Sequence, residues 1–265
     1  MFVFTIFATY LGSAAALFTR FSDQHAADKG RNLLLLMIVI AIAFHGGMLA
    51  NRVLLNPTVG IGLADVLNVI GWLFAVIGLF AAFQPGFRAL GGVVLAASAA
   101  MLTLQYLAGV SETAPLSWQL KLHAMLSLLA YSFLAAGAIL ALASLAQDRQ
   151  LRAARVTRLT NLLPPLLATE QFLATLTTSG FVFLLLSVTS GFVFIESLFT
   201  QHLTHKTVLS LVALAIFGVL VVGRRAAGWR GRRMLQLYLA AFVVLVLAYF
   251  GSKLVLEVLL DKQWG

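Results

Sequence analysis

The sequence contains no cysteine and few charged residues, and each of these two features excludes certain kinds of protein. Without cysteine the chain forms no disulfide, no thiolate metal site and no Cys-x-x-Cys pair for thiol exchange or covalent haem attachment. Any metal or haem must then be held by histidine, carboxylate or methionine. Charged residues make up only 10% of the chain, well below the share in soluble domains, so a sizeable soluble domain is excluded.

Hydrophobic residues make up 61% of the chain and gather in long runs. Windows of about 20 apolar residues, the length that crosses a bilayer core of roughly 30 Å, recur along the sequence. The eight windows lie near 1–20, 33–55, 61–83, 89–109, 120–147, 174–199, 205–223 and 234–260. The first window lacks the preceding cations of a cleavable signal peptide, so it is predicted to remain as a membrane helix. We expect an all-α polytopic membrane protein with eight transmembrane helices.

The connectors between these windows indicate one transmembrane domain over 1–265, with four helices in 1–109 and four in 120–260. Most connectors are short and carry turn signals, as tight hairpins require. These signals are Asn56-Pro57, Gln84-Pro85-Gly86 and Ala114-Pro115. Only the connector 148–173 is long, and Pro164-Pro165 interrupts it.

Cations are distributed unevenly between the two sides of the predicted helices. Thirteen of the eighteen Lys and Arg residues lie in connectors one, three, five and seven. Because Lys and Arg that flank membrane spans are retained in the cytoplasm, both termini are expected outside a bacterial cytoplasmic (inner) membrane. The net charge of +9 reflects this asymmetry and attraction to anionic lipid of the bilayer, and it requires no nucleic-acid partner.

Four of the five histidines fall toward the predicted outer face. His45 precedes Arg52 by seven residues, which places it roughly 10 Å below the outer interface. His123 is expected in the first turn of the fifth span, and His202 and His205 in the link between spans six and seven. An imidazole at this depth usually serves a haem iron, a divalent metal or a proton pathway. The alternative for each is a hydrogen-bonded residue at a helix end, which is weakest for the deep His45.

Small residues lie beside some of these positions. Gly46 and Gly47 follow His45 and would admit either a flat ligand or a neighbouring helix. The motifs Ser179-Gly180-Phe181 and Ser190-Gly191-Phe192 are eleven residues apart, about three helical turns, so their glycines share one face of the sixth span. That face is predicted to be either a helix contact surface or a groove for the edge of a porphyrin.

A series of short motifs follows in order along the second half of the chain. They are Leu122-His123, Ala130-Tyr131, Pro164-Pro165-Leu166-Leu167, Thr178-Ser179-Gly180-Phe181, Ser190-Gly191-Phe192, the runs 205–211 and 228–233, and Phe250-Gly251. Their order and spacing resemble the cytochrome c assembly superfamily, the group that contains the CcsA, CcmC and HemX proteins. The resemblance implies a membrane protein that handles haem, in which outer histidines ligate haem and an aromatic outer loop holds the porphyrin. On this resemblance, His123 matches the first external haem-ligand histidine.

The chain departs from that superfamily where its synthase members carry a tryptophan-rich haem loop. Here the end of that loop is replaced by the run Leu203-Thr204-His205-Lys206-Thr207. A later membrane histidine of the CcsA type falls at Val222, and no histidine follows Lys253. We therefore expect no synthase activity, and no sequence motif for hydrolysis or phosphate binding predicts another enzyme.

These observations predict non-covalent haem b near the outer face. The expected axial ligands are His123 and one of His45, His202 and His205, packed by Phe and Tyr side chains. Because neutral imidazole is the ligating form, binding is expected to weaken below about pH 6.

Two alternatives remain open at this point. In the first, the protein transports a divalent cation or assists a transporter, with Asp65, Glu196 and the outer histidines as a metal site. Hard ions such as magnesium want oxygen ligands, which are few within these spans. In the second, it is a regulatory scaffold of the HemX kind that recruits another membrane protein or a cytoplasmic partner. The basic segments 149–158 and 224–233 would then form the recruiting surface.

Overall fold

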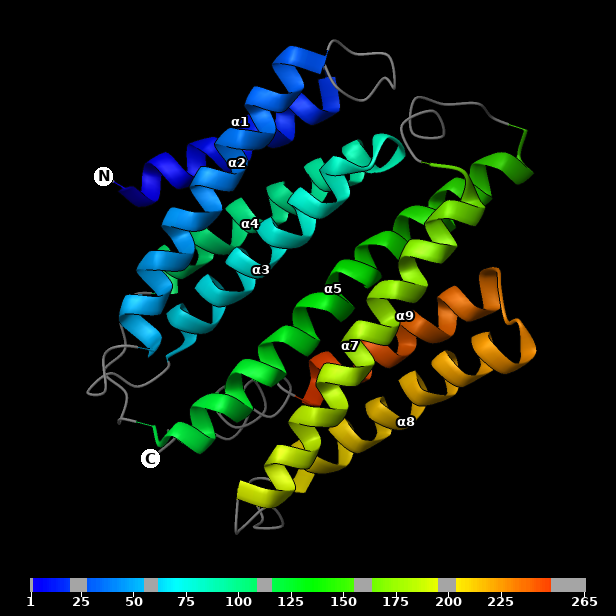
Figure 1. Ribbon diagram of the computed structural model, residues 1–265. Coiled ribbons are helices and arrows are strands. Elements are labelled where there is room, and N and C mark those ends of the chain that lie inside the picture. The colour runs from blue at the N-terminus through cyan, green and yellow to red at the C-terminus, as the bar shows by residue number, and fades with distance from the viewer. Residues whose placement is uncertain are drawn as a thin grey trace. The chain divides into compact units, whose positions relative to one another are not determined.

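The computed structural model describes residues 2–19, 28–54, 62–108, 116–154, 164–194 and 204–248, and throughout these ranges the elements are helical (Figure 1). The helices are α1 Phe2–Thr19, α2 Asp28–Leu49, α3 Leu63–Phe83, α4 Arg88–Ala108, α5 Trp118–Arg152, α7 Leu166–Phe194, α8 Thr204–Ala227 and α9 Arg232–Val246. Within the described ranges, seven of these, α1 to α8, are long and apolar enough to cross a membrane. The prediction of an all-α polytopic membrane protein is confirmed.

The eighth predicted span corresponds to α9. Its described helix has 15 residues, and the rest of the predicted span up to 260 lies outside the described residues. The predicted turn at Gln84-Pro85-Gly86 is confirmed as the 3₁₀ turn Pro85–Phe87, which joins α3 to α4. The turn signals Asn56-Pro57 and Ala114-Pro115 lie outside the described residues.

Helices α5 and α7 extend further than the apolar windows predicted, so the connector between them is shorter than expected. α5 continues to Arg152, which pairs with Asp148 one turn earlier at 3.0 Å. Arginine in the last turn of a helix also interacts favourably with the helix dipole. α7 begins directly after Pro165, since proline is tolerated at a helix start. Hydropathy missed these turns because residues 148–152 are mostly polar and Thr169-Glu170-Gln171 interrupts the apolar run at the start of α7.

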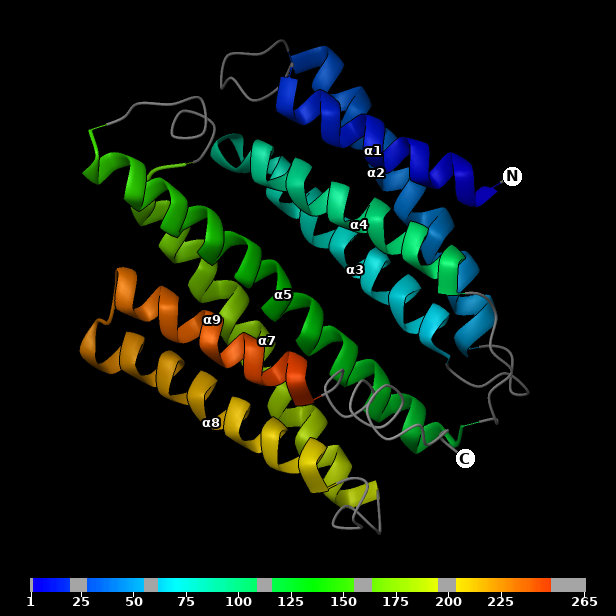
Figure 2. The same ribbon diagram turned by 180° about the vertical axis from the view of Figure 1, so that it is seen from behind.

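The described helices divide into two compact units, and each has its own packing. The first comprises residues 1–121 and 146–169, and its helices α1 to α4 form a four-helix bundle (Figure 2). In this bundle α4 packs against α1 and α3, while α2 packs against the same two helices. All four helices contribute to one buried apolar cluster, with Leu17, Ile38, Ala75 and Leu95 almost fully buried.

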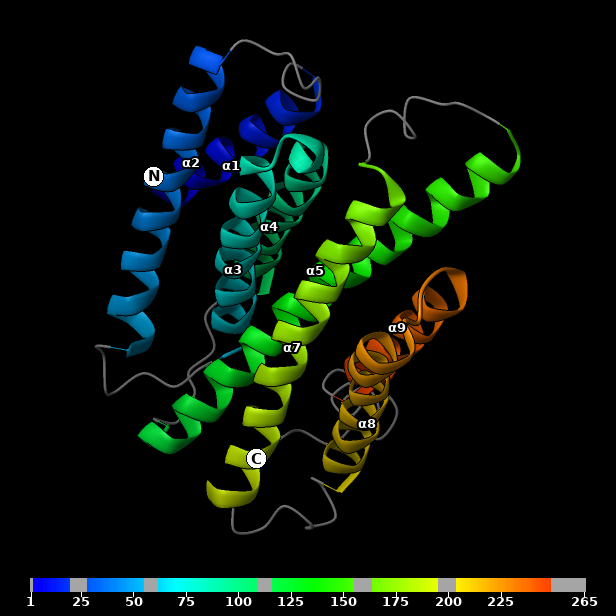
Figure 3. The ribbon, with the colours of Figure 1, turned by 45° about the vertical axis from the view of Figure 1, so that its right-hand side comes forward.

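The second unit comprises residues 122–145 and 170–265, which include most of α5 and α7 with all of α8 and α9. α8 and α9 form an antiparallel pair (Figure 3). Phe217 of α8 meets Tyr238 of α9 edge to face, with ring centroids 5.3 Å apart. The Tyr238 hydroxyl donates a hydrogen bond of 2.8 Å to the carbonyl oxygen of Leu134 on α5. Gly137 lies beneath this hydroxyl, and a Cβ there would collide with it.

Candidate functional site

His123 lies in the second turn of α5, and the expectation that it lies in the first turn is wrong. The helix begins earlier because Ser117 caps its N-terminus, and the Ser117 side chain accepts a hydrogen bond from the backbone N–H of Leu120. Serine is a favoured capping residue because its oxygen satisfies a backbone donor that the helix leaves unpaired. The imidazole is half-buried within the second unit.

The imidazole of His123 is held by α7. Its Nδ1 lies 3.0 Å from the carbonyl oxygen of Ser187 and 3.0 Å from Oγ of Ser190. A carbonyl oxygen only accepts hydrogen bonds, so Nδ1 carries the proton and donates it. Nε2 is then the nitrogen with the lone pair. Histidines that ligate metals are commonly oriented in this way, because a hydrogen bond from one ring nitrogen to a carbonyl fixes the tautomer.

Three serine hydroxyls surround this contact between α5 and α7. Ser190 Oγ donates to the carbonyl oxygen of Ser187 at 2.7 Å. Ser127 Oγ donates to the carbonyl oxygen of His123 at 2.9 Å and lies 2.6 Å from Ser187 Oγ. In a nucleophilic Ser-His pair the hydroxyl donates to the imidazole. Here the imidazole donates toward Ser190, so the cluster orients the ring and does not activate a serine.

The glycines of α7 make room for α5. A Cβ at Gly180 would lie 2.6 Å from Cδ2 of Leu134, and a Cβ at Gly191 would lie 3.2 Å from Cε1 of His123. Both glycines therefore face α5, and the predicted helix contact surface is confirmed. The imidazole of His123 packs against one end of this surface, at Gly191.

His45 has a different environment, inside the first unit. His45 is 2% exposed, and its hydrogen bonds connect α2, on which it lies, to α1 and α3. Asn68 Oδ1 on α3 lies 2.7 Å from Nε2, and the Tyr10 hydroxyl on α1 lies 3.2 Å from Nδ1. With the amide oxygen as acceptor, Nε2 donates and Nδ1 accepts from Tyr10. Both ring nitrogens of His45 are thus engaged, and iron ligation would require the loss of one hydrogen bond.

Gly46, beside His45, accommodates a neighbouring helix. A Cβ at Gly46 would lie 2.9 Å from Nε1 of Trp72, whose indole N–H donates to the carbonyl oxygen of Ile42 at 3.0 Å. α3 therefore approaches α2 closely at this point. For Gly47 no heavy atom of the described residues lies within 4 Å of a Cβ built there. Of the two predicted explanations for Gly46, helix packing agrees with the structure.

Asp65, the acidic residue of the alternative metal site, is already engaged. It lies in the first turn of α3, is 3% exposed and forms an ion pair with Arg52, which lies in the π-helical turn Ala50–Leu54 after α2. Its Oδ2 also accepts from the backbone N–H of Gly62 at 3.1 Å. Across the described parts of the chain, no group of three or more His, Cys, Asp and Glu residues could hold a metal ion.

The remaining predicted ligands were not located. Glu196 and His202 lie outside the described residues, and so does the side chain of His205, whose backbone belongs to the first turn of α8. Sequence reasoning missed Tyr10, Asn68, Arg52 and Ser127 as partners. Ser127 carried a usable signal, because it follows His123 by four residues and so lies on the same helix face.

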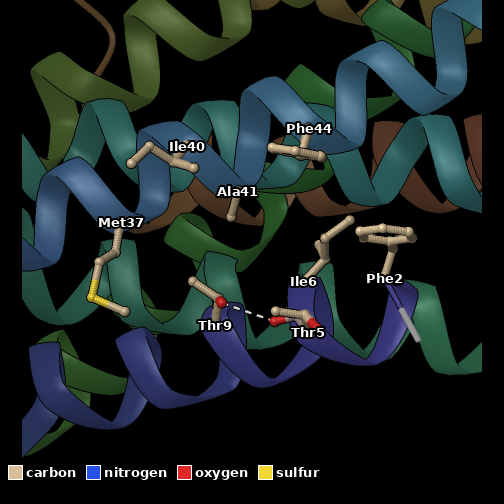
Figure 4. A pocket seen from close by; sticks show the side chains of 8 residues that line it. All are labelled: Phe2, Thr5, Ile6, Thr9, Met37, Ile40, Ala41 and Phe44. Atoms are coloured by element: carbon tan, nitrogen blue, oxygen red, sulfur yellow. Dashed lines mark hydrogen bonds between the residues drawn. The ribbon is translucent and has the colours of Figure 1, made fainter.

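A separate groove of about 340 Å³ lies between α1 and α2 in the first unit (Figure 4). It is lined by Phe2, Thr5, Ile6, Thr9, Met37, Ile40, Ala41 and Phe44. Phe2 and Phe44 stack with ring centroids 6.4 Å apart, and the Thr9 hydroxyl donates to the carbonyl oxygen of Thr5. The groove is apolar, and none of the candidate ligands lines it.

Comparison with known proteins agrees with these membrane features. The chain is 35% identical over 137 residues to the inner membrane protein YpjD of Escherichia coli K12, an alignment that covers 52% of each chain. It is 34% identical over 149 residues to an uncharacterized 28.8 kDa protein of Azospirillum brasilense, covering 56% of this chain and 55% of the other. The chain thus spans about half the length of the curated relatives it matches. No solved structure matches it.

The likeness to an inner membrane protein and the seven candidate spans place the chain in the bacterial inner membrane as a multi-pass protein. The family match extends beyond the second half of the chain, where the sequence motifs lie, and includes the bundle of α1 to α4. Because the model of the cytochrome c assembly protein family matches residues 2–260, the chain belongs to that family.

Proposed function

We propose that the protein binds haem b non-covalently in the inner membrane, with Nε2 of His123 as one axial ligand. The observation that carries this proposal is the hydrogen bond from Nδ1 of His123 to the carbonyl oxygen of Ser187. It selects the tautomer in which Nε2 offers a lone pair, the form that an iron requires. Membership of the cytochrome c assembly protein family supports haem as the group to be bound.

The environment of His123 fits a flat, largely apolar ligand. Gly191 leaves the edge of the ring without a side chain beside it, and Phe192 on the next position of α7 is 47% exposed. Within the second unit, Phe133 of α5 and Phe183 of α7 stack with ring centroids 5.7 Å apart, so aromatic side chains already pack between these two helices. A porphyrin would be held by such packing, because aromatic rings bury large apolar area and stack favourably.

The second axial ligand is proposed to be His202 or His205. Ser190 and Gly191, which contact His123, lie in the last turns of α7, and α7 ends at Phe194. His202 follows α7 in the sequence just before α8 begins at Thr204, and His205 is the second residue of α8. Chain connectivity therefore supports these two over His45, whose nitrogens already bind Tyr10 and Asn68.

The proposed topology has eight spans, with both termini outside and the haem near the periplasmic face. The cation bias supports this orientation, because thirteen of eighteen Lys and Arg residues lie on the other side. α9 would be the eighth span, continued by the apolar residues that follow Val246.

The proposed role is haem handling without catalysis by the chain itself. The described serines around His123 support this, because their hydrogen bonds orient the imidazole and do not place a hydroxyl as donor to it. The substitution of the tryptophan-rich loop of the synthase members by the run 203–207 supports the same conclusion.

Absorption spectroscopy of the detergent-purified protein, oxidised and dithionite-reduced, tests the proposal when combined with pyridine haemochrome quantitation per chain. The wild type is expected to carry close to one b-type haem, and His123→Ala is expected to carry almost none. His45→Ala is the matched control, since it removes the other located histidine. Haem content unchanged in His123→Ala, or no haem in the wild type even after incubation with hemin, would contradict the proposal.

A further inference from the structure

The turn between α8 and α9 concentrates positive charge. Five of the ten residues from 224 to 233 are arginine: Arg224, Arg225, Arg230, Arg232 and Arg233. α8 ends at Ala227 and α9 begins at Arg232, so four residues reverse the chain (Figure 3). Gly228 and Gly231 adopt φ angles of +62° and +80°, which residues with a Cβ rarely adopt. This tight reversal brings the last turn of α8 beside the first turn of α9.

Trp229 fixes the tip of this turn. Its backbone N–H donates to the carbonyl oxygen of Gly223 at 3.2 Å, and its ring folds over Gly223, where a Cβ would lie 2.6 Å from Cε3. The side chain still has 43% of its surface exposed. Tryptophan with one packed face and one exposed edge is typical of the headgroup level of a membrane. The indole therefore indicates that the tip lies at the membrane surface.

The charges of the turn are only partly compensated. Glu170 of α7 accepts a hydrogen bond of 3.1 Å from the backbone N–H of Gly231, and its charge attracts Arg224. Arg230 repels Arg224. Arg232 and Arg233 are exposed in the first turn of α9, the end of a helix where its dipole disfavours cations. The position of these arginines does not stabilise α9 itself. It is explained if they bind an external anion.

We propose that the turn from Arg224 to Arg233 is a docking surface for the headgroups of anionic phospholipid. Guanidinium groups bind phosphate oxygens through paired hydrogen bonds, and the indole of Trp229 places them at the depth of the phosphates. Basic residues beside a membrane attract anionic lipid in this way. The inference is independent of the proposed haem binding, which concerns His123. On the proposed orientation the surface faces the cytoplasmic leaflet.

Native mass spectrometry of the full chain tests this in micelles that contain equal amounts of phosphatidylglycerol and phosphatidylcholine. The wild type is expected to retain phosphatidylglycerol in preference to phosphatidylcholine. Each arginine at an anionic surface contributes about fivefold in affinity, so Arg232→Gln/Arg233→Gln should weaken retention about 25-fold. The matched control is Arg149→Gln/Arg152→Gln, the same loss of charge at the end of α5, where Arg152 already pairs with Asp148. This control should weaken retention by no more than about fivefold, since among the described residues only Arg149 is removed from an unpaired position.

Several outcomes would overturn the proposal. Equal retention of both lipids would show no selectivity for anions, and equal loss in the two double variants would show only bulk attraction. Displacement of phosphatidylglycerol by an equal concentration of glycerol 3-phosphate would assign the surface to a soluble phosphate compound. If Arg232→Gln/Arg233→Gln melts early in phosphatidylcholine micelles, Arg225→Gln/Arg230→Gln replaces it, because both residues are exposed. The same 25-fold weakening is then expected.

Discussion

The imidazole of His123 packs against the backbone of Gly191, where a side chain as small as alanine would place its Cβ 3.2 Å from Cε1 of the ring. This contact and the hydrogen bond to the carbonyl oxygen of Ser187 both come from α7, and together they position the ring. The orientation of His123 is therefore set by α7 and not by α5, on which the residue lies.

Gly191→Ala is expected to lower haem content while leaving the bundle folded. The added methyl group would displace the imidazole by a few tenths of an ångström and misalign Nε2 with the iron. The measurement is haem per chain by pyridine haemochrome, with melting followed by intrinsic tryptophan fluorescence. Gly47→Ala serves as the control, because nothing described lies within 4 Å of a Cβ there. Full haem content in Gly191→Ala would contradict this role of the glycine.

Substitution of His123 and of His45 is expected to have opposite effects on haem content and on stability. His123→Ala should remove haem with a small loss of stability. His45→Ala should leave haem in place and lower the free energy of unfolding by about 1–3 kcal/mol, because Tyr10 and Asn68 lose their buried partner. Denaturant unfolding and the reduced absorption spectrum of both variants check this. Loss of haem in His45→Ala at unchanged stability would instead make His45 a ligand.

Loss of Arg52 from its ion pair with Asp65 is expected to destabilise the protein more than loss of Asp65. The Asp65 side chain is 4% exposed, and that of Arg52 is 39% exposed. Arg52→Gln leaves a buried carboxylate without its cation and should destabilise the protein by about 1–3 kcal/mol, whereas Asp65→Asn leaves an arginine that water can reach. Thermal unfolding of both variants and the double variant measures this. A greater loss in Asp65→Asn would contradict the expectation.

Gly137→Ala is expected to destabilise the contact of α5 with α9 by about 1–3 kcal/mol through overpacking. The methyl group would collide with the Tyr238 hydroxyl, and the side chain of Tyr238 is fully buried. Tyr238→Phe in the same chain should restore part of the loss, because it removes the colliding oxygen. Melting temperatures of the single and double variants provide the measurement. Equal melting temperatures of Gly137→Ala and the double variant would contradict this explanation.

The sequence predicted the helices well where hydropathy alone decides them. α1, α3 and α4 begin and end within two residues of their apolar windows. The last turn of α5 and the start of α7 were missed, because polar residues end or interrupt the apolar run at these points and an apolar window stops there. The glycine face of α7 was predictable because the spacing of Gly180 and Gly191 follows from the helical period alone.

Partners across helices were not predictable. The bonds from His45 to Tyr10 and Asn68 join residues 35 and 23 positions apart, and they depend on how three helices are rotated about their axes. The same holds for Ser187, whose backbone carbonyl holds His123, because a carbonyl oxygen is present at every residue and leaves no mark in the sequence. Hydropathy places a residue at a depth, but only packing decides which neighbour it faces.

The hydrogen bond from Tyr238 to the carbonyl oxygen of Leu134 bears on how the protein is assembled in the bilayer. A tyrosine hydroxyl in hydrocarbon without a partner is costly, and its acceptor belongs to a helix far earlier in the chain. Burial of α9 is therefore coupled to the presence of α5, which is synthesised first. The last described helix completes a bundle that already exists, and a chain that began after Leu134 would leave the Tyr238 hydroxyl of α9 without its acceptor.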